Sequence, residues 1–454
     1  MSTVIIVDPI STGGAMAAEL HSRGIKMICV WSNEVGEMRT HVPDIAKHLS
    51  WLAVLEEGSD GIESLALQVQ QVVSESKTEL VACLAGGEPG VLCADALSSA
   101  LNLRSNGVEP QRRNKSWQQK AVRAAGLRAT REASGTSVDD ACVQAFLSSE
   151  QYPIIVKPTE SAGSDGVKKC ATKAEAEAHF EVLMHAQHRV GSVGAAVICQ
   201  EFLAGDEYVV DHASRDGEHK LVMIWKYDRR PCNGGDFVLF SMVPVPSDAP
   251  EVAGLVAYTR GVLDALSLKH GASHAEVMLT ADGPCLVEMN CRAHGADGVW
   301  APLARALTGG YSQLDAAADA ALDAAAFEAL PGRYGPFKAA GQFTQLVSRS
   351  EGTIASLAPL DAVRALPSFQ HMQVSVDVAV GRRLVRTVDL FTAMGFAIQC
   401  HDDPAIVAAD VAAIRAMEEA GALVELVEPS SSCSSEADAG MPIKADQRVL
   451  VSVQ

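Results

Sequence analysis

Residues 274–298, two short apolar runs joined by Asp282-Gly283, constrain the fold of this chain more than any other stretch. Asp-Gly between apolar runs is a turn signal, so the stretch predicts a hairpin of two strands followed by an irregular basic loop. Glu276 stands in the first run, and Glu288 and Asn290 stand in the second. Because side chains alternate along a strand, Glu288 and Asn290 point to the same face.

The register of this hairpin decides whether its acidic side chains meet. A three-residue connection, residues 281–283 with a left-handed glycine at its end, would pair Glu276 directly with Glu288. Two carboxylates at that spacing repel unless a hard divalent cation such as Mg²⁺ lies between them. Arg292 follows, and its planar guanidinium suits a phosphate or a carboxylate. The alternative is a solvent-facing hairpin edge, although Glu288 and Asn290 interrupt an otherwise apolar strand.

Composition narrows the class of protein. The 454 residues have room for two to four domains with ample core. The net charge of −19 disfavours nucleic acid or an anionic membrane surface as a partner. The eleven cysteines are scattered without a CxxC pair, which is typical of a reduced cytosolic protein. No signal peptide and no stretch of membrane-spanning length is evident. We expect a soluble cytoplasmic protein, with a homodimer as the oligomer to test.

The first hundred residues predict a small doubly wound α/β domain. Its expected strands and helices alternate, with strands at 3–8, 25–31 and 79–84 and helices at 15–23 and 90–101. The first turn reads Ser-Thr-Gly-Gly rather than GxGxxG, and no acidic residue ends the second strand. A nicotinamide dinucleotide is therefore not the expected ligand. A basic linker at 104–117 and a helix at 116–125 follow; Lys115 there would ordinarily be a solvated surface charge.

An apolar strand at 152–158 carries one lysine, Lys157, near its end. Burying that lysine without an anionic partner would be costly. The small-residue loop 159–166, which includes Ser161 and Gly163, leads to a strand at 167–170. Such a loop lets backbone N–H groups approach phosphate oxygens. The alternative is a plain glycine-rich hairpin with a snorkelling lysine.

Two further strands place acids at their ends. The strand at 195–202 carries Glu201, and the strand at 207–212 begins with Glu207. The backbone between them could lie along an adenine ring, and Glu207 could take ribose hydroxyls. The alternative is two exposed acids at strand ends.

A strand at 220–227 leads to a predicted ten-residue loop, residues 228–237, with two arginines, two glycines and a proline. Loops of this composition at the mouth of a site often hold substrates. For Arg229 and Arg230 a solvated basic pair is the commoner alternative.

The remaining expected elements are helices at 249–266, 297–307, 313–330 and 404–420 and strands at 339–347, 372–378, 396–400 and 423–427. A serine-rich acidic segment at 429–440 follows them, and its composition is typical of disorder.

Three motifs in this order, IVKP with its small-residue loop, QEFLAGDEYVVD and HAEVM…LVEMNCR, resemble the ATP-grasp superfamily. More narrowly they are similar to the carboxylate–amine ligases, including the L-amino acid ligases, with a C-terminal domain like that of the biotin-carboxylase group. The resemblance implies an α/β fold of the α+β ATP-grasp type. Its implied parts are a pre-ATP-grasp α/β domain at 1–110, a lid region at 111–200, a core with the metal site at 201–335, a C-terminal α+β domain at 336–428 and a flexible tail at 429–454.

The resemblance also implies ATP as cofactor, with Mg²⁺ or Mn²⁺. The residues it assigns are Lys115, Lys157, Ser161 and Gly163 for the phosphates, Glu201, Phe202 and Leu203 for adenine, Glu207 for ribose, Glu276, Glu288 and Asn290 for the metal, and Arg292 for phosphate or an acyl-phosphate. Relatives often have proline where this chain has Cys291, which loosens the match to any one subfamily.

The activity implied by the resemblance is ligation of a small-molecule carboxylate to an amine. ATP would phosphorylate the carboxylate, and the amine would displace phosphate to form an amide bond of the dipeptide type. Lys157 and Arg292 would be catalytic, with His294, Arg229 and Arg230 as substrate contacts. The alternatives are an ATP-dependent carboxylase of the biotin-carboxylase type and a nucleotide-binding module without turnover. The complete metal-binding set favours an enzyme.

Overall fold

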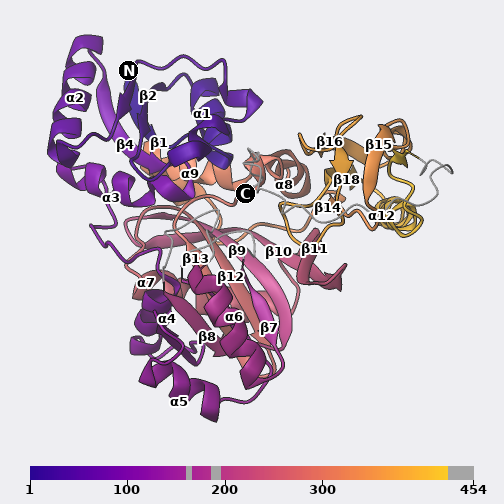
Figure 1. The fold of residues 1–454 in the computed structure, drawn as a ribbon. Coiled ribbons are helices and arrows are strands. Elements are labelled where there is room, and N and C mark those ends of the chain that lie inside the picture. The colour runs from indigo at the N-terminus through magenta and orange to yellow at the C-terminus, as the bar shows by residue number, and fades with distance from the viewer. Residues whose placement is uncertain (160–165, 186–195, 428–454) are drawn as a thin grey trace.

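The computed structural model describes residues 1–159, 166–185 and 196–427, which form four sheets and their covering helices (Figure 1). The predicted phosphate-loop residues Ser161 and Gly163 and the predicted tail lie outside the described residues. The chain has the mixed α/β architecture that the sequence predicted. No helix among the described residues is long and apolar enough to cross a membrane.

The N-terminal sheet is parallel, with strand order β3-β2-β1-β4. Its elements are β1 (Ser2–Val7), α1 (Thr12–Ser22), β2 (Lys26–Trp31), β3 (Ala53–Glu56), α2 (Gly61–Ser76), β4 (Glu79–Ala85) and α3 (Val91–Ala100). Side chains of β1 alternate between two cores, since Ile5 packs with α2 and α3 while Ile6 packs with α1. Helices therefore cover both faces, as predicted, although the sequence reading missed β3 and α2.

A small antiparallel sheet, with order β5-β8-β6-β7, forms the lower part of Figure 1. Its strands are β5 (Glu132–Gly135), β6 (Ile154–Pro158), β7 (Lys168–Cys170) and β8 (Val197–Glu201), and its helices are α5 (Ala141–Ser149) and α6 (Lys173–His185). The helix α4 (Lys115–Ala124) precedes it and packs against the large sheet. The sequence reading did not include β5, α5 or α6.

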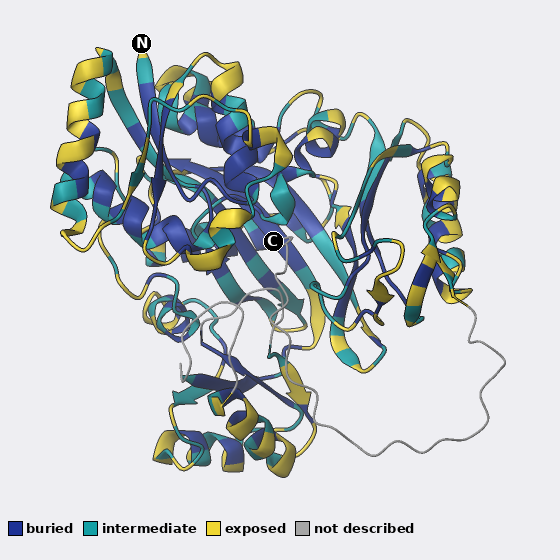
Figure 2. Ribbon diagram, turned by 45° about the horizontal axis from the view of Figure 1, so that its top comes forward, coloured by how far each residue is buried: buried dark blue, intermediate teal, exposed yellow. Residues whose placement is uncertain are grey.

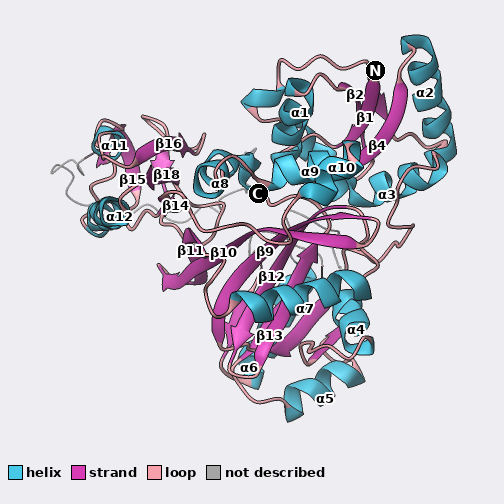
Figure 3. Cartoon of the chain, turned by 180° about the vertical axis from the view of Figure 1, so that it is seen from behind, coloured by secondary structure: helices cyan, strands magenta, loops and turns pink. Residues whose placement is uncertain are grey.

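The large sheet has eight antiparallel strands in the order β13-β12-β9-β10-β11-β14-β18-β16. Its strands are β9 (Gly205–Arg215), β10 (Glu218–Cys232), β11 (Gly235–Pro244), β12 (Gly271–Thr280), β13 (Gly283–Asn290), β14 (Ala340–Leu346), β16 (Phe369–Val374) and β18 (Gly395–His401). The helices after β11 and β13 are α7 (Val252–Ala265), α8 (Ala301–Thr308), α9 (Gln313–Leu322) and α10 (Ala324–Ala329). Seen from behind, α7 crosses the back of β12 and β13 (Figure 3).

The C-terminal part adds a three-stranded sheet and two helices beside the end of the large sheet. These elements are β15 (Gly352–Ser356), α11 (Leu360–Arg364), β17 (Arg383–Leu384), α12 (Pro404–Glu419) and β19 (Glu425–Leu426). The large sheet runs into this part without a break, because Met242 of β11 pairs with Phe343 of β14. Figure 2 shows that the strands are mostly buried while the helices expose their outer faces.

Two predictions about the backbone are wrong. The single helix expected at 313–330 is divided into α9 and α10, because Asp323 between them has extended backbone angles. Residues 228–237 do not form a loop but continue β10 into β11, with a two-residue turn at Asn233-Gly234. Both turn residues have positive φ (53° and 91°), which Asn-Gly adopts readily in tight hairpins. Pro231 is tolerated because β9 pairs with β10 only as far as Tyr227, so this end of β10 has one neighbour.

Candidate active site

A cavity of about 880 Å³ is lined by residues of the small sheet and of the large sheet. Across its floor runs a row of paired residues, Glu207 on β9, Tyr227 on β10, Met242 on β11 and Phe343 on β14. Lys157 on β6 lines the opposing wall. The cavity therefore extends from the strands that carry the predicted nucleotide contacts to the C-terminal part of the sheet.

The hairpin of β12 and β13 brings the predicted metal ligands together. Glu276 pairs with Glu288, as the sequence predicted. The connection is shorter than predicted, since Thr280 pairs with Gly283, whose φ is 98°. The register shifts at Val287, which faces no partner between the pairs on either side. A two-residue turn and one bulged residue thus give the register that we expected from a three-residue loop.

Glu276, Glu288 and Asn290 all line the cavity, and the Nδ2 of Asn290 lies 3.3 Å from Oε1 of Glu288. Lys115, the first residue of α4, places its Nζ 2.8 Å from Oε2 of Glu288. Burial alone would raise the pKa of Glu276, but the hydrogen bond from His274 and nearby cations outweigh it and lower the pKa to about 2. Two carboxylates and an amide oxygen form a donor set that fits a hard divalent cation.

Lys157 is 4% exposed and faces this acidic group across the cavity. Burial, and secondarily the charge of Lys115, lowers its pKa to about 8, while Glu288 and Glu132 oppose that shift. The described residues offer Lys157 no ion pair within 4 Å. A buried cation that faces a cavity is poised to receive an anionic ligand.

The predicted adenine residues are divided between the cavity and the protein interior. Phe202 and Leu203 line the cavity, and Nζ of Lys169 lies 4.0 Å from the centre of the Phe202 ring. The carboxylate of Glu201 instead contacts Arg131. It accepts a hydrogen bond from the backbone N–H of Arg131 at 2.8 Å and forms an ion pair with the Arg131 guanidinium at 2.7 Å. Of the three residues predicted to contact adenine, Phe202 and Leu203 thus line the cavity, whereas the side chain of Glu201 is engaged by Arg131.

The two predicted substrate arginines have opposite environments. Arg229 lines the cavity, and its Nε lies 2.7 Å from Oε2 of Glu207, the predicted ribose contact. Arg230 is 57% exposed at its side chain and forms an ion pair with Asp228. The solvated side chain that we considered therefore holds for Arg230 and is wrong for Arg229, whose side chain is 19% exposed. Burial raises the pKa of Glu207, and Arg229 counters that effect.

The loop after β13 is held by the N-terminal part of the chain. Nε of Arg292 forms a 3.0 Å ion pair with Glu88, which follows β4, and its Nη2 donates to Oδ1 of Asn290 at 3.2 Å. The hydroxyl of Thr12 donates to the carbonyl oxygens of His294 at 2.6 Å and Gly295 at 2.9 Å. Two parts of the chain that are far apart in sequence thus meet around Arg292.

This loop also stores backbone strain. Ala296 and Asp297 both have positive φ, 56° and 53°, a conformation that residues with a side chain rarely adopt. At Gly298, with φ of 70°, a Cβ atom would lie 2.6 Å from Cβ of Ala15 in α1. Strain of this kind persists only where surrounding contacts fix the backbone, and it clusters at functional sites.

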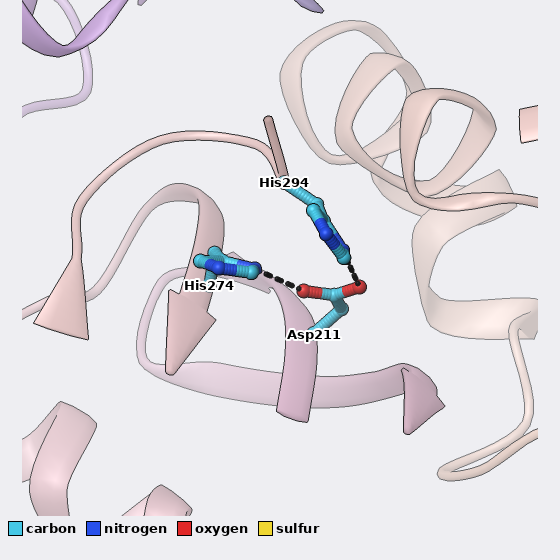
Figure 4. Close-up of side chains that lie close together, drawn as sticks. All are labelled: Asp211, His274 and His294. Carbon is cyan, nitrogen blue, oxygen red and sulfur yellow. Dashed lines mark hydrogen bonds and ion pairs between the residues drawn. The ribbon is translucent and has the colours of Figure 1, made fainter. Parts of the chain in front are cut away.

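A buried group, Asp211, His274 and His294, links strands of the large sheet to the loop after β13 (Figure 4), and both histidines, including the predicted substrate contact His294, line the cavity. Asp211 on β9 accepts hydrogen bonds from Nδ1 of His274 and from Nδ1 of His294, each at 3.0 Å, and from Nε1 of Trp225 at 3.0 Å. Nε2 of His294 is then free to accept from the hydroxyl of Tyr227 at 3.3 Å. The trio has the spacing of a cation site, but N–H donors already occupy both carboxylate oxygens.

The two histidines of this group have pKa values shifted in opposite directions. Burial opposes a charge on His274, yet Asp211 and Glu276 outweigh burial and raise its pKa to about 9. Burial also lowers the pKa of His294, and there it prevails. Nε2 of His274 lies 3.5 Å from Oε1 of Glu276. The network therefore holds a predicted metal ligand at one end and the cavity residue Tyr227 at the other.

Sequence reasoning missed four residues of this arrangement, and each left some signal. Asp211 interrupts the apolar run YVVDHA, and Glu88 follows a buried strand through Gly-Gly. Thr12 lies in the first βα turn, where ligands of open sheets often bind. Tyr227 was counted within a strand but without a role. Single polar residues in apolar strands were the available clue.

Comparison with known proteins places this geometry in a family. The model of the ATP-grasp domain matches residues 150–299. The chain is 30% identical to dapdiamide A synthase of Enterobacter agglomerans over 422 residues, which cover 91% of this chain and 95% of that protein. Over a shorter stretch of 168 residues it is 30% identical to the phosphoribosylamine–glycine ligase of Halalkalibacterium halodurans, covering 35% of this chain and 38% of that one.

Solved structures share the fold. An L-amino acid ligase from Bacillus licheniformis superposes with a TM-score of 0.69 at 17% identity, covering 92% of this chain and 97% of that one. A carboxyaminoimidazole ribonucleotide synthase from Aspergillus clavatus, in complex with ATP, gives a TM-score of 0.64 at 14% identity, covering 92% and 99%. Together with the match to dapdiamide A synthase along nearly the whole chain, these findings show that this protein belongs to the ATP-grasp carboxylate–amine ligases, enzymes that form a carbon–nitrogen bond and convert ATP to ADP.

Proposed function

We propose that this ligase joins a small-molecule carboxylate to an amine through an acyl-phosphate. One observation carries the proposal: two lysines, two carboxylates, an amide and an arginine from several parts of the chain converge on one cavity. These residues are Lys115, Lys157, Glu276, Glu288, Asn290 and Arg292. Phosphoryl transfer needs positioning and charge neutralisation more than a covalent nucleophile, and this set supplies both.

Each group has a distinct task in the proposed site. Lys115 and Lys157 would neutralise the phosphates of ATP, and the backbone at Phe202 and Leu203 would read the adenine edge. Glu276, Glu288 and Asn290 would hold Mg²⁺, which would supply positive charge to neutralise the phosphates.

The proposed reaction has two steps. A carboxylate oxygen of the first substrate bonds to the γ-phosphorus as the bond to the β,γ-bridging oxygen breaks, which gives an acyl-phosphate and ADP. The amine nitrogen then bonds to the acyl carbon, the carbon–oxygen bond to phosphate breaks, and the amine loses a proton to solvent. Arg292 would hold the carboxylate and then the acyl-phosphate oxygens with its two parallel donors.

The direct test is turnover with defined substrates. Incubation with ATP, Mg²⁺ and mixtures of amino acids should release ADP and phosphate in equal amounts, with a new amide detected by mass spectrometry. Chelation of the metal should stop both. Absence of ATP binding at millimolar concentration would refute the proposal, and ATP binding without phosphate release would indicate a binding module. Strict dependence on bicarbonate would indicate a carboxylase instead.

The contact between Glu88 and Arg292 yields a further prediction. Glu88→Gln keeps the shape of the side chain but removes the charge that orients Arg292, so turnover should fall by about tenfold to a hundredfold, because a small misplacement of a reacting group is costly. The KM for ATP should change little, since Glu88 does not line the cavity. Steady-state kinetics with varied ATP and varied carboxylate separate the two effects.

Glu34→Gln is the matched control. Glu34 pairs with Arg113, which also pairs with Glu88, but it makes no contact with Arg292. Its turnover should stay within about twofold of the wild type, as expected for loss of a partly exposed ion pair. Equal losses in the two variants would mean that the acidic pair only supports the fold around Arg113.

A further inference from the structure

The proposed function assigns no ligand to the end of the cavity that is lined by β14. Its lining consists of Phe343 and Gln345 on β14, Met242 on β11 and Leu390 in the segment before β18. Phe343 and Gln345 are two positions apart on one strand, so both point to the cavity face. None of the charged residues that line the cavity comes from β14 or from the segment around Leu390.

Gln345 is unusual among these residues. Its side chain is buried, at 3% exposure, and its Nε2 donates to the carbonyl oxygen of Gly395 at 2.8 Å. Its Oε1 is a buried acceptor with no hydrogen-bond partner among the described residues. A buried amide oxygen left without a donor costs about 1–3 kcal/mol, so such groups usually serve a bound molecule.

The distance from the reacting groups sets the length of that molecule. Tyr227 on β10 contacts His294, close to Arg292, and β14 lies two strands beyond β10. Neighbouring strands are about 4.8 Å apart, so Phe343 and Gln345 lie roughly 10 Å beyond Tyr227. A single small amino acid bound at Arg292 would not reach them.

We infer that the β14 end of the cavity binds the far end of an elongated carboxylate substrate, an uncharged amide whose N–H donates to Oε1 of Gln345. The inference rests on the proposed function, because it places the reacting carboxylate at Arg292. An ammonium group is disfavoured there, because no carboxylate lines this end to balance its charge. The apolar walls of Met242, Phe343 and Leu390 suit the chain that joins amide to carboxylate. The substrate class is thus an acid of dipeptide length or an N-acyl amino acid.

The test uses hydroxylamine as the amine, so that only the acid varies and any acyl-phosphate is trapped as a hydroxamate. Two matched series are compared: ω-amido acids, which end in a primary amide, and the corresponding ω-methyl-ketone acids, which have the same shape but no N–H. Chain length between the two ends is varied in each. We expect kcat/KM for the amide to exceed that for the ketone by about tenfold at the best length, the worth of one neutral hydrogen bond. The preference should be absent from the shortest acids.

Gln345→Leu and Gln345→Met should bring the amide-to-ketone ratio close to one. Gln342→Leu is the matched control, since Gln342 lies on the same strand but on the opposite face, and it should keep the wild-type ratio. A wild-type ratio near one at every length, or an unchanged ratio in a folded Gln345 variant, would overturn the inference. The wild-type comparison decides the question even where both variants fail to fold. Absence of hydroxamate from every acid would instead contradict the proposed function.

Discussion

Replacing Lys157 with methionine should reduce ADP release by at least a hundredfold. Lys157 is buried, lines the same cavity as the carboxylates proposed to bind metal, and has no ion-pair partner among the described residues. A donor aimed at charge that develops on a transferring phosphoryl group typically contributes about a hundredfold to a thousandfold in rate. The measurement is the initial rate of ADP formation at saturating ATP and Mg²⁺, with the KM for ATP obtained from the same data.

The same substitution should not destabilise the protein in the absence of ATP. The pKa of Lys157 is lowered from 10.5 to about 8, chiefly by burial, so the folded state holds this charge less readily than the unfolded state does. Below pH 8 the wild type bears the full cost of that buried charge, and the cost disappears as pH rises through 8 toward 10.5. Lys157→Met should therefore melt at or above the wild-type temperature at pH 7, and this advantage should shrink by pH 10.

Lys168→Met is the control, because Lys168 is exposed on the neighbouring strand β7. Its rate and melting temperature should match those of the wild type. If Lys157→Met unfolds without ATP, the lysine stabilises the fold rather than binding the phosphates. If Lys157→Met and Lys168→Met lose the same activity, only the general positive charge of this part of the chain matters.

Replacing Arg292 with alanine should abolish ligation, with a loss of about a hundredfold to a thousandfold in turnover. The side chain is fixed on two sides, by Glu88 and by Oδ1 of Asn290, and it lines the cavity directly after β13, the strand that carries two of the proposed metal ligands. Arg292→Lys should recover little, because an ammonium keeps the charge but lacks the two parallel donors that grip a carboxylate. Hydroxamate formation with hydroxylamine isolates the first step and shows whether acyl-phosphate is still made.

Variants of Arg229 and Arg230 show whether a loss of activity is specific to Arg292. Arg229→Ala should raise the KM for ATP by about tenfold, since it removes the hydrogen-bond partner of Glu207, the proposed ribose contact. This differs from the sequence reading, which assigned Arg229 to the substrate and left ATP unaffected. Arg230→Ala should change neither constant by more than about twofold, because its ion pair is exposed. Equal small effects from all three variants would show that the carboxylate is held elsewhere.

The sequence determined those features that depend on local rules. Alternation along β13 placed Glu288 and Asn290 on one face, and the Asp-Gly turn placed Glu276 opposite Glu288. The order of the lysine strand, the acidic strands and the hairpin with the predicted metal ligands identified the family before any contact was known. Periodicity and turn chemistry act over a few residues, so a linear sequence displays them.

The wrong prediction of a loop at 228–237 also came from local sequence features. The turn signal Asn233-Gly234 was present, but the proline and paired arginines led us to predict a loop at 228–237. The strand places Arg229 at the cavity and leaves Arg230 exposed to solvent. That distinction needed the pairing of β10 with β11.

Only the tertiary structure decided which distant residues meet. Glu88 reaches Arg292, and Thr12 reaches the carbonyls of His294 and Gly295, across more than two hundred positions in sequence. Gln345 joins the same cavity because β14 continues the sheet beyond β11. No periodicity encodes such contacts. They arise when whole elements pack to bury apolar faces, and the polar residues that this packing brings together then determine what the site can bind.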